Sequence, residues 1–155
     1  MIIYRELKEE EIKQAVTFFH FLLDETECID EQELLPTENN INILRVLIYG
    51  SYRIGIPCYC AEDEETNRIV AIMLTAKIDV FETKLKTVHS FGTYVLHKYR
   101  DKGIATKLLK HAFDELRNIG IQRVYGKFFK QRESSNKIIE ELGMERLNFV
   151  ICKTL

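Results

Sequence analysis

A short basic turn between an apolar strand and an amphipathic helix constrains the fold of this chain more than any other feature. The turn covers residues 100–105 (RDKGIA), follows the strand-like segment 91–96 and precedes apolar residues at helical spacing. Amides at the start of a helix have no partner inside it, and the helix dipole favours an anion there. Gly103 lets a ligand approach the backbone, while Arg100 and Lys102 supply positive charge. The segment therefore predicts a strand–turn–helix unit that binds a phosphate or pyrophosphate.

The turn resembles the acetyl-coenzyme A signature of the GNAT superfamily of N-acetyltransferases. That signature is Arg or Gln, two residues, Gly, one residue and then Gly or Ala, entered from a strand that ends in Val. Val95, Arg100, Gly103 and Ala105 match it in type and spacing, while His97 stands where the family often has Pro. A helix that simply begins after a basic turn would contain the same short run, so the rest of the chain has to separate the two interpretations.

A second segment, residues 134–144, resembles the family's second motif. Its end, LGM at 142–144, stands where many members have Leu-Gly-Phe, although a capped amphipathic helix would give the same pattern without a ligand. The family's frequent Asn falls on Arg132, but Asn136 resembles a common variant and could hydrogen-bond the pantetheine arm. The family's frequent Tyr, which protonates the departing thiolate, falls on Ile139, so the usual general acid is absent.

The resemblance implies acetyl-CoA as the acetyl donor and no metal. The residues that it implies in cofactor binding are Val95, Leu96, Arg100, Asp101, Lys102, Gly103, Ile104, Ala105, Thr106 and Asn136. In this family the oxyanion is stabilised by a backbone N–H on the strand that enters the first motif. That role implies Val95 or its neighbour as a catalytic position.

His89 is the candidate general base, acting directly or through water, because imidazole titrates near neutral pH. It precedes Val95 on what simple alternation predicts to be the same face of a strand, near where some members carry a catalytic Glu. A histidine at a strand start that bonds only to solvent is the alternative. Tyr94 or Tyr125 could replace the missing acid, although a packed tyrosine is the expectation for each. A thiol with a pKa of about 8.5 can also leave without an acid.

The length of 155 residues predicts one domain over residues 1–155, and hydrophobic periodicity predicts the element order β-α-α-β-β-β-α-β-α-β. The expected strands cover residues 2–5, 57–61, 69–76, 88–96, 122–129 and 146–153. The expected helices cover residues 12–24, then the segment from the N-cap Thr37 to Gly50, then 104–119 before Gly120, and 134–142. This order predicts an α/β fold of the α+β type, with a central mixed, largely antiparallel sheet flanked by about four helices, as in the GNAT fold.

Charge is distributed unevenly along the chain. Residues 1–40 contain eleven acids and three basic residues, whereas residues 77–132 contain thirteen Lys or Arg and five acids. Such polarity favours an anion site at one end and a cation-tolerant region at the other. In the family, the region between the first strand and the hairpin shapes the acceptor side. Here that region contains acids without a nearby base, which are Asp24, Glu25, Glu27, Asp30, Glu31 and Glu33.

The first hypothesis is therefore an acetyl-CoA-dependent N-acetyltransferase acting on a small cationic amine. Two alternatives stay open: an N-acetyltransferase acting on a protein or peptide amine, and a non-catalytic acyl-CoA-binding regulatory module, which the absent Tyr at Ile139 would favour. Nucleic acid is not an expected partner, because the basic cluster from Lys98 to Lys107 is short and the net charge is −2. A homodimer is left open.

The remaining composition predicts a cytoplasmic protein that does not bind a membrane. No apolar run reaches spanning length, and the N-terminal residues lack a signal-peptide layout. Four cysteines show no paired metal-ligand spacing. Cys58 and Cys60 are expected on one face of a strand as buried free thiols.

Overall fold

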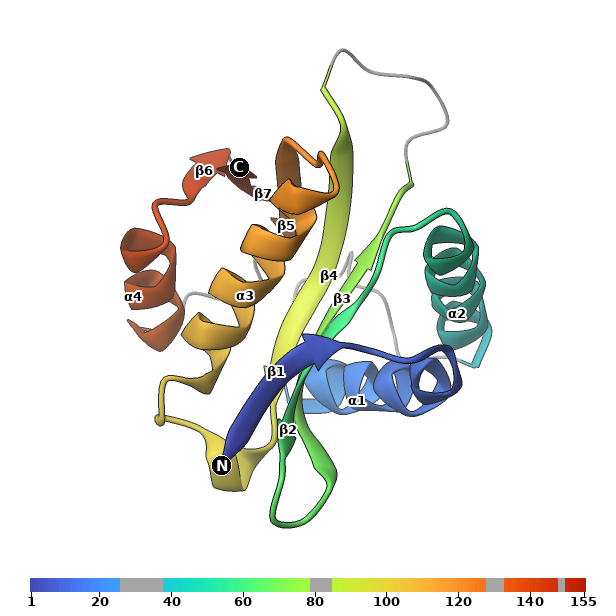
Figure 1. Ribbon diagram of the computed structural model, residues 1–155, viewed down its shortest axis with the longest axis vertical. Helices are drawn as coiled ribbons and strands as arrows, with labels where there is room; N and C mark the ends of the chain where they lie inside the picture. Colours follow the sequence, from blue (N-terminus) through green and yellow to red (C-terminus); the bar gives the residue numbers. More distant parts are fainter. Residues whose placement is uncertain (26–37, 79–84, 128–132, 148–149) are drawn as a thin grey trace.

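The computed structural model describes residues 1–25, 38–78, 85–127, 133–147 and 150–155. The elements follow the predicted order along the chain (Figure 1). The helices are α1 (Ile12–Glu25), α2 (Glu38–Arg53), α3 (Ile104–Asn118) and α4 (Glu133–Glu141), with short 3-10 helices η1 (Glu9–Glu11) and η2 (His97–Tyr99). The strands are β1 (Ile2–Glu6), β2 (Tyr59–Asp63), β3 (Arg68–Ala76), β4 (Thr87–Val95), β5 (Arg123–Lys127), β6 (Glu145–Leu147) and β7 (Val150–Thr154).

The strands form one mixed sheet in the order β1-β2-β3-β4-β5-β7-β6. Among the described pairs only β4 and β5 run parallel, joined by the α3 crossover, and the others are antiparallel. The predicted α/β fold with a largely antiparallel sheet is therefore confirmed. The single final strand predicted over 146–153 was wrong in one respect, because the structure contains two antiparallel strands there, β6 and β7.

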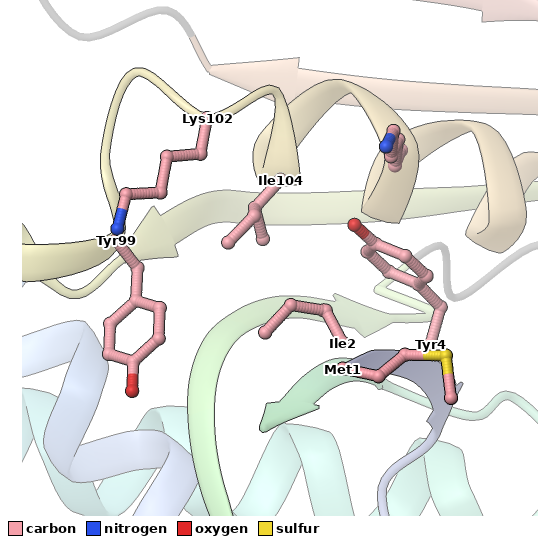
Figure 2. Close-up of a pocket in the computed structure, with 7 residues that line it drawn as sticks. Met1, Ile2, Tyr4, Tyr99, Lys102 and Ile104 are labelled. Carbon is pink, nitrogen blue, oxygen red and sulfur yellow. The ribbon is translucent and has the colours of Figure 1, made fainter. Parts of the chain in front are cut away.

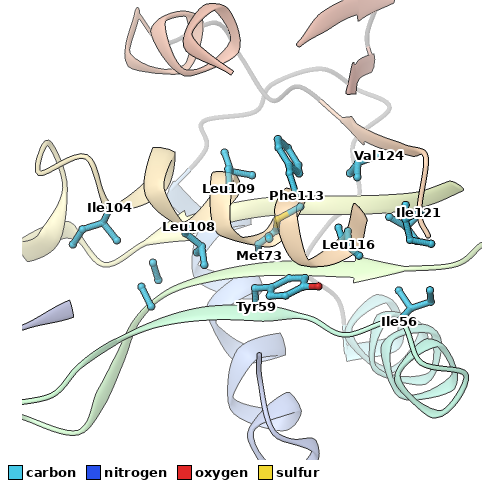
Figure 3. Close-up of a cluster of buried hydrophobic side chains, with 14 of the residues drawn as sticks. Ile56, Tyr59, Met73, Ile104, Leu108, Leu109, Phe113, Leu116, Ile121 and Val124 are labelled. Atoms are coloured by element: carbon cyan, nitrogen blue, oxygen red, sulfur yellow. The ribbon is translucent and has the colours of Figure 1, made fainter. Parts of the chain in front are cut away.

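Two hydrophobic cores lie on opposite faces of the sheet. Alternation along β3 sends Ala71 and Met73 into the core under α3, and Ile72 and Leu74 into the core under α1 and α2. Helix α3 buries one stripe, seen from the side in Figure 3, which consists of Ile104, Leu108, Leu109, Ala112, Phe113 and Leu116. The spacing of that stripe is the helical period that the sequence predicts. The sheet thus separates an α3 face from an α1–α2 face (Figure 1).

The residues predicted to begin or end the helices have different outcomes in the structure. Gly120 follows α3 with a φ of 84°, as predicted for a residue that ends a helix. The predicted stop at Gly50 was wrong, since α2 continues to Arg53. Thr37, the expected N-cap of α2, lies outside the described residues.

Cys58 and Cys60 are free, buried and part of the same core, as expected for alternate residues of a strand. Burial raises the pKa of the Cys58 thiol to about 11 and that of Cys60 to about 12. Both thiols are therefore protonated and unreactive at neutral pH. None of the helices in the described parts of the chain is long and apolar enough to cross a membrane.

Candidate active site

The turn between β4 and α3 leaves the start of α3 open to an anion. Gly103 occupies the N-cap position with a φ of 71°, and Asp101 also has a positive φ, 60°. No side chain within the described residues caps the helix, and its first internal bond runs from the Lys107 N–H to the Gly103 carbonyl over 3.1 Å. The amides of residues 104–106 therefore precede the hydrogen-bonded part of the helix, where its dipole favours negative charge.

Two cations are fixed at this turn. The Nε of Arg100 donates a hydrogen bond of 2.9 Å to the carbonyl oxygen of Val95, and its Cζ lies 5.5 Å from the centre of the Tyr94 ring. The Nζ of Lys102 lies 5.5 Å from the centre of the Tyr99 ring. Both distances fall in the range of cation–π contacts. The turn thus presents positive charge whose position is set by β4 and η2.

The hairpin between β2 and β3 anchors η2. The hydroxyl of Tyr99 donates to Oδ2 of Asp63 over 2.7 Å. This bond lowers the pKa of the Asp63 carboxyl and raises that of the Tyr99 phenol. The Tyr99 amide also bonds to the Leu96 carbonyl over 2.8 Å, so η2 is tied both to β4 and to the hairpin.

A β-bulge interrupts β4 just after the last residue that pairs with β5. In the register with β3, Thr75 faces Ser90 but Leu74 faces Gly92, which leaves Phe91 as the extra residue. Gly92 has a φ of 128°, and its amide donates to the Ser90 Oγ over 3.3 Å. A bulge bends its strand and increases the local twist. Here it lies where β4 and β5 separate.

The pairing of β4 with β5 ends at Ser90 and Gly126, while β4 continues to Val95. The Leu96 N–H bonds to the Val70 carbonyl over 2.9 Å, which sets the alternation along the β3–β4 pair. Residues in this pairing point their amides alternately toward and away from the neighbouring strand. The amides of Thr93 and Val95 therefore point away from β3, on the side that β5 has left. We call this side of β4 the 93–95 edge.

Thr93 was not a predicted site residue. Its amide points in the same direction as that of Val95 and lies nearer to the place where β5 departs. Gly92 inside a strand was the sequence signal that could have revealed the bulge, because glycine in a strand interior often marks one. From the bulge, Thr93 would have followed as the next position on the edge.

The bulge also changes the face on which His89 lies. His89 is opposite Ala76 of β3, on the α1–α2 face, whereas Val95 is opposite Ala71 and packs on the α3 face. The expectation that His89 and Val95 share a face was therefore wrong, because the extra residue Phe91 reverses the alternation. The side chain of His89 therefore lies on the α1–α2 face, opposite the face on which the side chain of Val95 lies.

The two tyrosines considered as replacement acids have different surroundings. Tyr94 is buried and stacks on Phe18 of α1, with ring centres 6.1 Å apart, as expected for a packed tyrosine. Tyr125 is half-buried and stacks on His89, with ring centres 5.5 Å apart, and its hydroxyl accepts from Nη1 of Arg123 at 3.4 Å. Tyr125 thus shares the α1–α2 face with His89.

Helix α4 holds the other predicted cofactor residue. The Oδ1 of Asn136 accepts a hydrogen bond of 2.5 Å from Nη2 of Arg146, at the start of β6. This contact directs Asn136 toward β6, and no contact brings it to the turn in the part of the chain that the structure describes. Ile139, at the position of the family's Tyr, is buried with 5% of its surface exposed.

The described residues fit acetyl-CoA, the donor that the resemblance implies. Uncapped amides, Arg100 and Lys102 match the needs of a pyrophosphate, and the 93–95 edge offers backbone donors to the amide-containing arm. In the ranges that the structure describes, no group of three His, Cys, Asp or Glu side chains could hold a metal ion.

Comparison with known proteins agrees with this geometry. The model of the acetyltransferase (GNAT) family matches residues 16–144. No curated protein matches the chain. The ribosomal-protein-alanine N-acetyltransferase of Brucella melitensis has a similar structure, with a TM-score of 0.75, 18% identity and 99% of each chain covered.

Two further solved structures have the same fold. The protein yncA of Salmonella typhimurium, solved with its cofactor acetyl-CoA, has a TM-score of 0.75 and 17% identity, over 100% of this chain and 94% of its own. A mosquito arylalkylamine N-acetyltransferase like 5b gives a TM-score of 0.75 and 17% identity over 100% of both chains. Because the family model matches most of this chain, residues 16–144, the chain belongs to the acetyltransferase (GNAT) family and is an acetyl-CoA-dependent N-acetyltransferase.

Proposed function

We propose that the enzyme transfers the acetyl group of acetyl-CoA to the amine of a small cationic molecule. The observation that carries the proposal is the separation of β5 from β4 after Ser90. It leaves the amides of Thr93 and Val95 pointing away from β3, and β4 then leads into the turn before the uncapped start of α3. A cofactor with a phosphate at one end and an acyl group at the other could bind along this path, with its phosphate at the start of α3 and its acyl group at the 93–95 edge.

The amides at the start of α3, together with Arg100 and Lys102, bind the pyrophosphate in this proposal. The other residues predicted to bind the cofactor here, which are Leu96, Asp101, Gly103, Ile104, Ala105 and Thr106, supply the backbone of the turn and its flanks. The Thr93 or Val95 amide donates to the acetyl oxygen as negative charge develops there. Removing one such donor typically costs a factor of about 100–1000 in rate.

His89 takes the proton of the incoming amine in this proposal, directly or through one water. Amines resembling lysine have a pKa of about 10.4, so the nucleophilic form needs a proton acceptor. Because His89 lies on the α1–α2 face and the cofactor turn belongs to the α3 face, the acceptor and the donor approach from opposite sides of the sheet. The thiolate then leaves unprotonated or receives a proton from Tyr125.

The acceptor is assigned from charge. Helix α1 ends at Glu25, and the acids that follow it, through Glu33, belong to the region between β1 and β2. Those after Glu25 lie outside the described residues, and the sequence assigns this region its acidic charge. A cluster of acids attracts a cation over a distance set by ionic strength.

A thiol-release assay with acetyl-CoA over a panel of small amines and basic peptides tests the proposal. We expect turnover with cationic small amines, and a KM for the amine that rises at low salt when Asp24, Glu25 and Glu27 are replaced together by Ala. Preference for the peptides would assign the enzyme to the alternative acceptor class, whereas an unchanged KM would remove the role of the acids.

His89→Phe tests the base because a phenyl ring can keep the stack on Tyr125. Loss of a general base typically lowers the rate by a factor of about 100–10,000, and the loss should shrink as the pH approaches the pKa of the amine, where the amine loses its proton without a base. A His97→Phe variant is the matched control, since His97 is an exposed histidine of the same chain. Equal activity of wild type and His89→Phe would remove His89 from the mechanism.

A further inference from the structure

A cavity of about 410 Å³ lies between β1 and the start of α3, beside the turn (Figure 2). The residues that line it are Met1, Ile2, Tyr4, Tyr99, Lys102, Ile104 and Lys107. In the sheet order, β1 and β4 are separated by β2 and β3, so the β1 wall of the cavity lies three strands away from the 93–95 edge, while its other wall is the turn and the start of α3. It is therefore a different place from the site of acetyl transfer.

The walls of the cavity combine apolar and aromatic surfaces with the polar ends of two tyrosines and two lysines. Ile104 of α3 and Ile2 of β1 face each other across it, and the rings of Tyr99 and Tyr4 stand on either side (Figure 2). Tyr99 is fixed in position by its hydrogen bond to Asp63. Such a space suits a planar apolar group, because aromatic rings prefer stacked or edge contacts with other rings.

The charge of the lining is positive. Lys102 and Lys107 contribute two ammonium groups, and none of the lining residues is acidic. Burial raises the pKa of the Tyr4 phenol, so its hydroxyl stays protonated at neutral pH and can donate a hydrogen bond. Together these groups complement an anion attached to the apolar group.

We propose that this cavity binds a planar apolar group that carries a negative charge, such as a carboxylate, sulfonate or phosphate. Two sources have this chemistry: a free aromatic anion that regulates the enzyme, or the nucleotide end of the acetyl donor. Lys102 belongs to both the cavity and the pyrophosphate turn, so a ligand in the cavity acts on donor binding in either case. Only the second source rests on the proposed function.

Binding of 8-anilinonaphthalene-1-sulfonate, whose aromatic rings carry one sulfonate, tests the cavity by a fluorescence titration of the folded protein. We expect saturable binding with one site per chain and a Kd that rises at least fivefold in Lys107→Gln. Lys110→Gln is the matched control, since Lys110 is an exposed lysine of α3 that does not line the cavity. An unchanged Kd in Lys107→Gln, or an equal change in both variants, would overturn the proposal.

Competition then distinguishes the sources. If adenosine 3′,5′-bisphosphate displaces the probe in wild type, and Lys107→Gln raises the KM for acetyl-CoA at least fivefold but not that for S-acetylpantetheine, the cavity holds the nucleotide end of the donor. If the probe and coenzyme A bind together, the ligand is a separate anion. Both outcomes support the cavity as an anion site. Since probe binding requires no acetyl transfer, failure of the proposed reaction leaves this test intact.

Discussion

The Nε of Arg100 donates a 2.9 Å hydrogen bond to the carbonyl oxygen of Val95, which joins the two ends of the cofactor motif. The carbonyl lies on the 93–95 edge, on the same side as the Val95 amide. Arg100 therefore does more than bring positive charge to a phosphate. It also fixes the distance between the strand that would bind the acyl arm and the turn that would bind the pyrophosphate.

Arg100→Lys keeps the charge but removes the planar guanidinium and its Nε donor. We expect the Kd for coenzyme A to rise about tenfold, since a hydrogen bond from a charged group contributes roughly 1.5–3 kcal/mol and part of that is retained by the ammonium. Isothermal titration calorimetry would measure it. Arg117→Lys, an exposed position near the other end of α3, should bind as wild type does. Wild-type affinity in Arg100→Lys would contradict the dual role.

Replacing Gly103, which has a left-handed conformation, should lower the stability of the fold even without a ligand. A Cβ there meets no atom within 4 Å, so Gly103→Ala is opposed by its φ of 71° and not by crowding. The left-handed region costs other residues about 1–2 kcal/mol, which lowers Tm by about 2–4 °C for each kcal/mol in a chain of this size.

Gly50→Ala is the control for that substitution. Gly50 also has open space around it, but it lies inside α2 and is not among the residues with positive φ. Alanine in a helix interior is favoured over glycine by about 0.5–1 kcal/mol, so this variant should melt at a higher temperature. If both substitutions shift Tm in the same direction, the conformational explanation is wrong.

The order of helices and strands could be predicted because hydrophobic periodicity and turn residues can be recognised within a short stretch of sequence. The stripe of α3 and the glycines at its two ends, Gly103 and Gly120, are visible in a short window of sequence. The anion-binding geometry of the turn follows from the same window, since it depends on the start of a helix.

The bulge at Phe91 and the partner of Asn136 could not be predicted in the same way. Alternation assumes an uninterrupted strand, and one extra residue moves every later side chain to the other face, as it did for His89 and Val95. The hydrogen bond from Arg146 to Asn136 joins β6 to α4, and the choice of such a partner depends on how two elements are placed relative to each other.

An ion pair under β1 gives the fold a dependence on acid pH. The Arg5 guanidinium donates to both carboxylate oxygens of Glu11 over 2.8 Å, and the two side chains are only 24% and 19% exposed. This bond lowers the pKa of Glu11 below its usual value. A lowered carboxylate pKa stabilises the fold above the unfolded pKa of about 4.3, and that stabilisation is lost as pH falls through the folded pKa.

Glu11→Gln should therefore lower the free energy of unfolding by about 1.5–3 kcal/mol at pH 7, and the difference from wild type should shrink below about pH 4. Urea titrations between pH 3 and 7 would measure both. Glu9→Gln, an exposed neighbour on η1, should show little difference at any pH. A difference for Glu11→Gln that stays constant down to pH 3 would exclude the ion pair as its cause.

Ser90 should control the direction in which the backbone amides of the 93–95 edge point. Its Oγ accepts the amide of Gly92 inside the bulge, so Ser90→Ala leaves that amide without this acceptor and relaxes the backbone that leads to Thr93. A shift of about 1 Å in a catalytic group can cost roughly a hundredfold in rate. We expect kcat to fall tenfold or more while the KM for acetyl-CoA changes little, because the turn at Gly103 is untouched. Ser90→Thr retains a hydroxyl and should restore kcat. If Ser90→Ala and Ser90→Thr have equal activity, the hydroxyl does not position the edge.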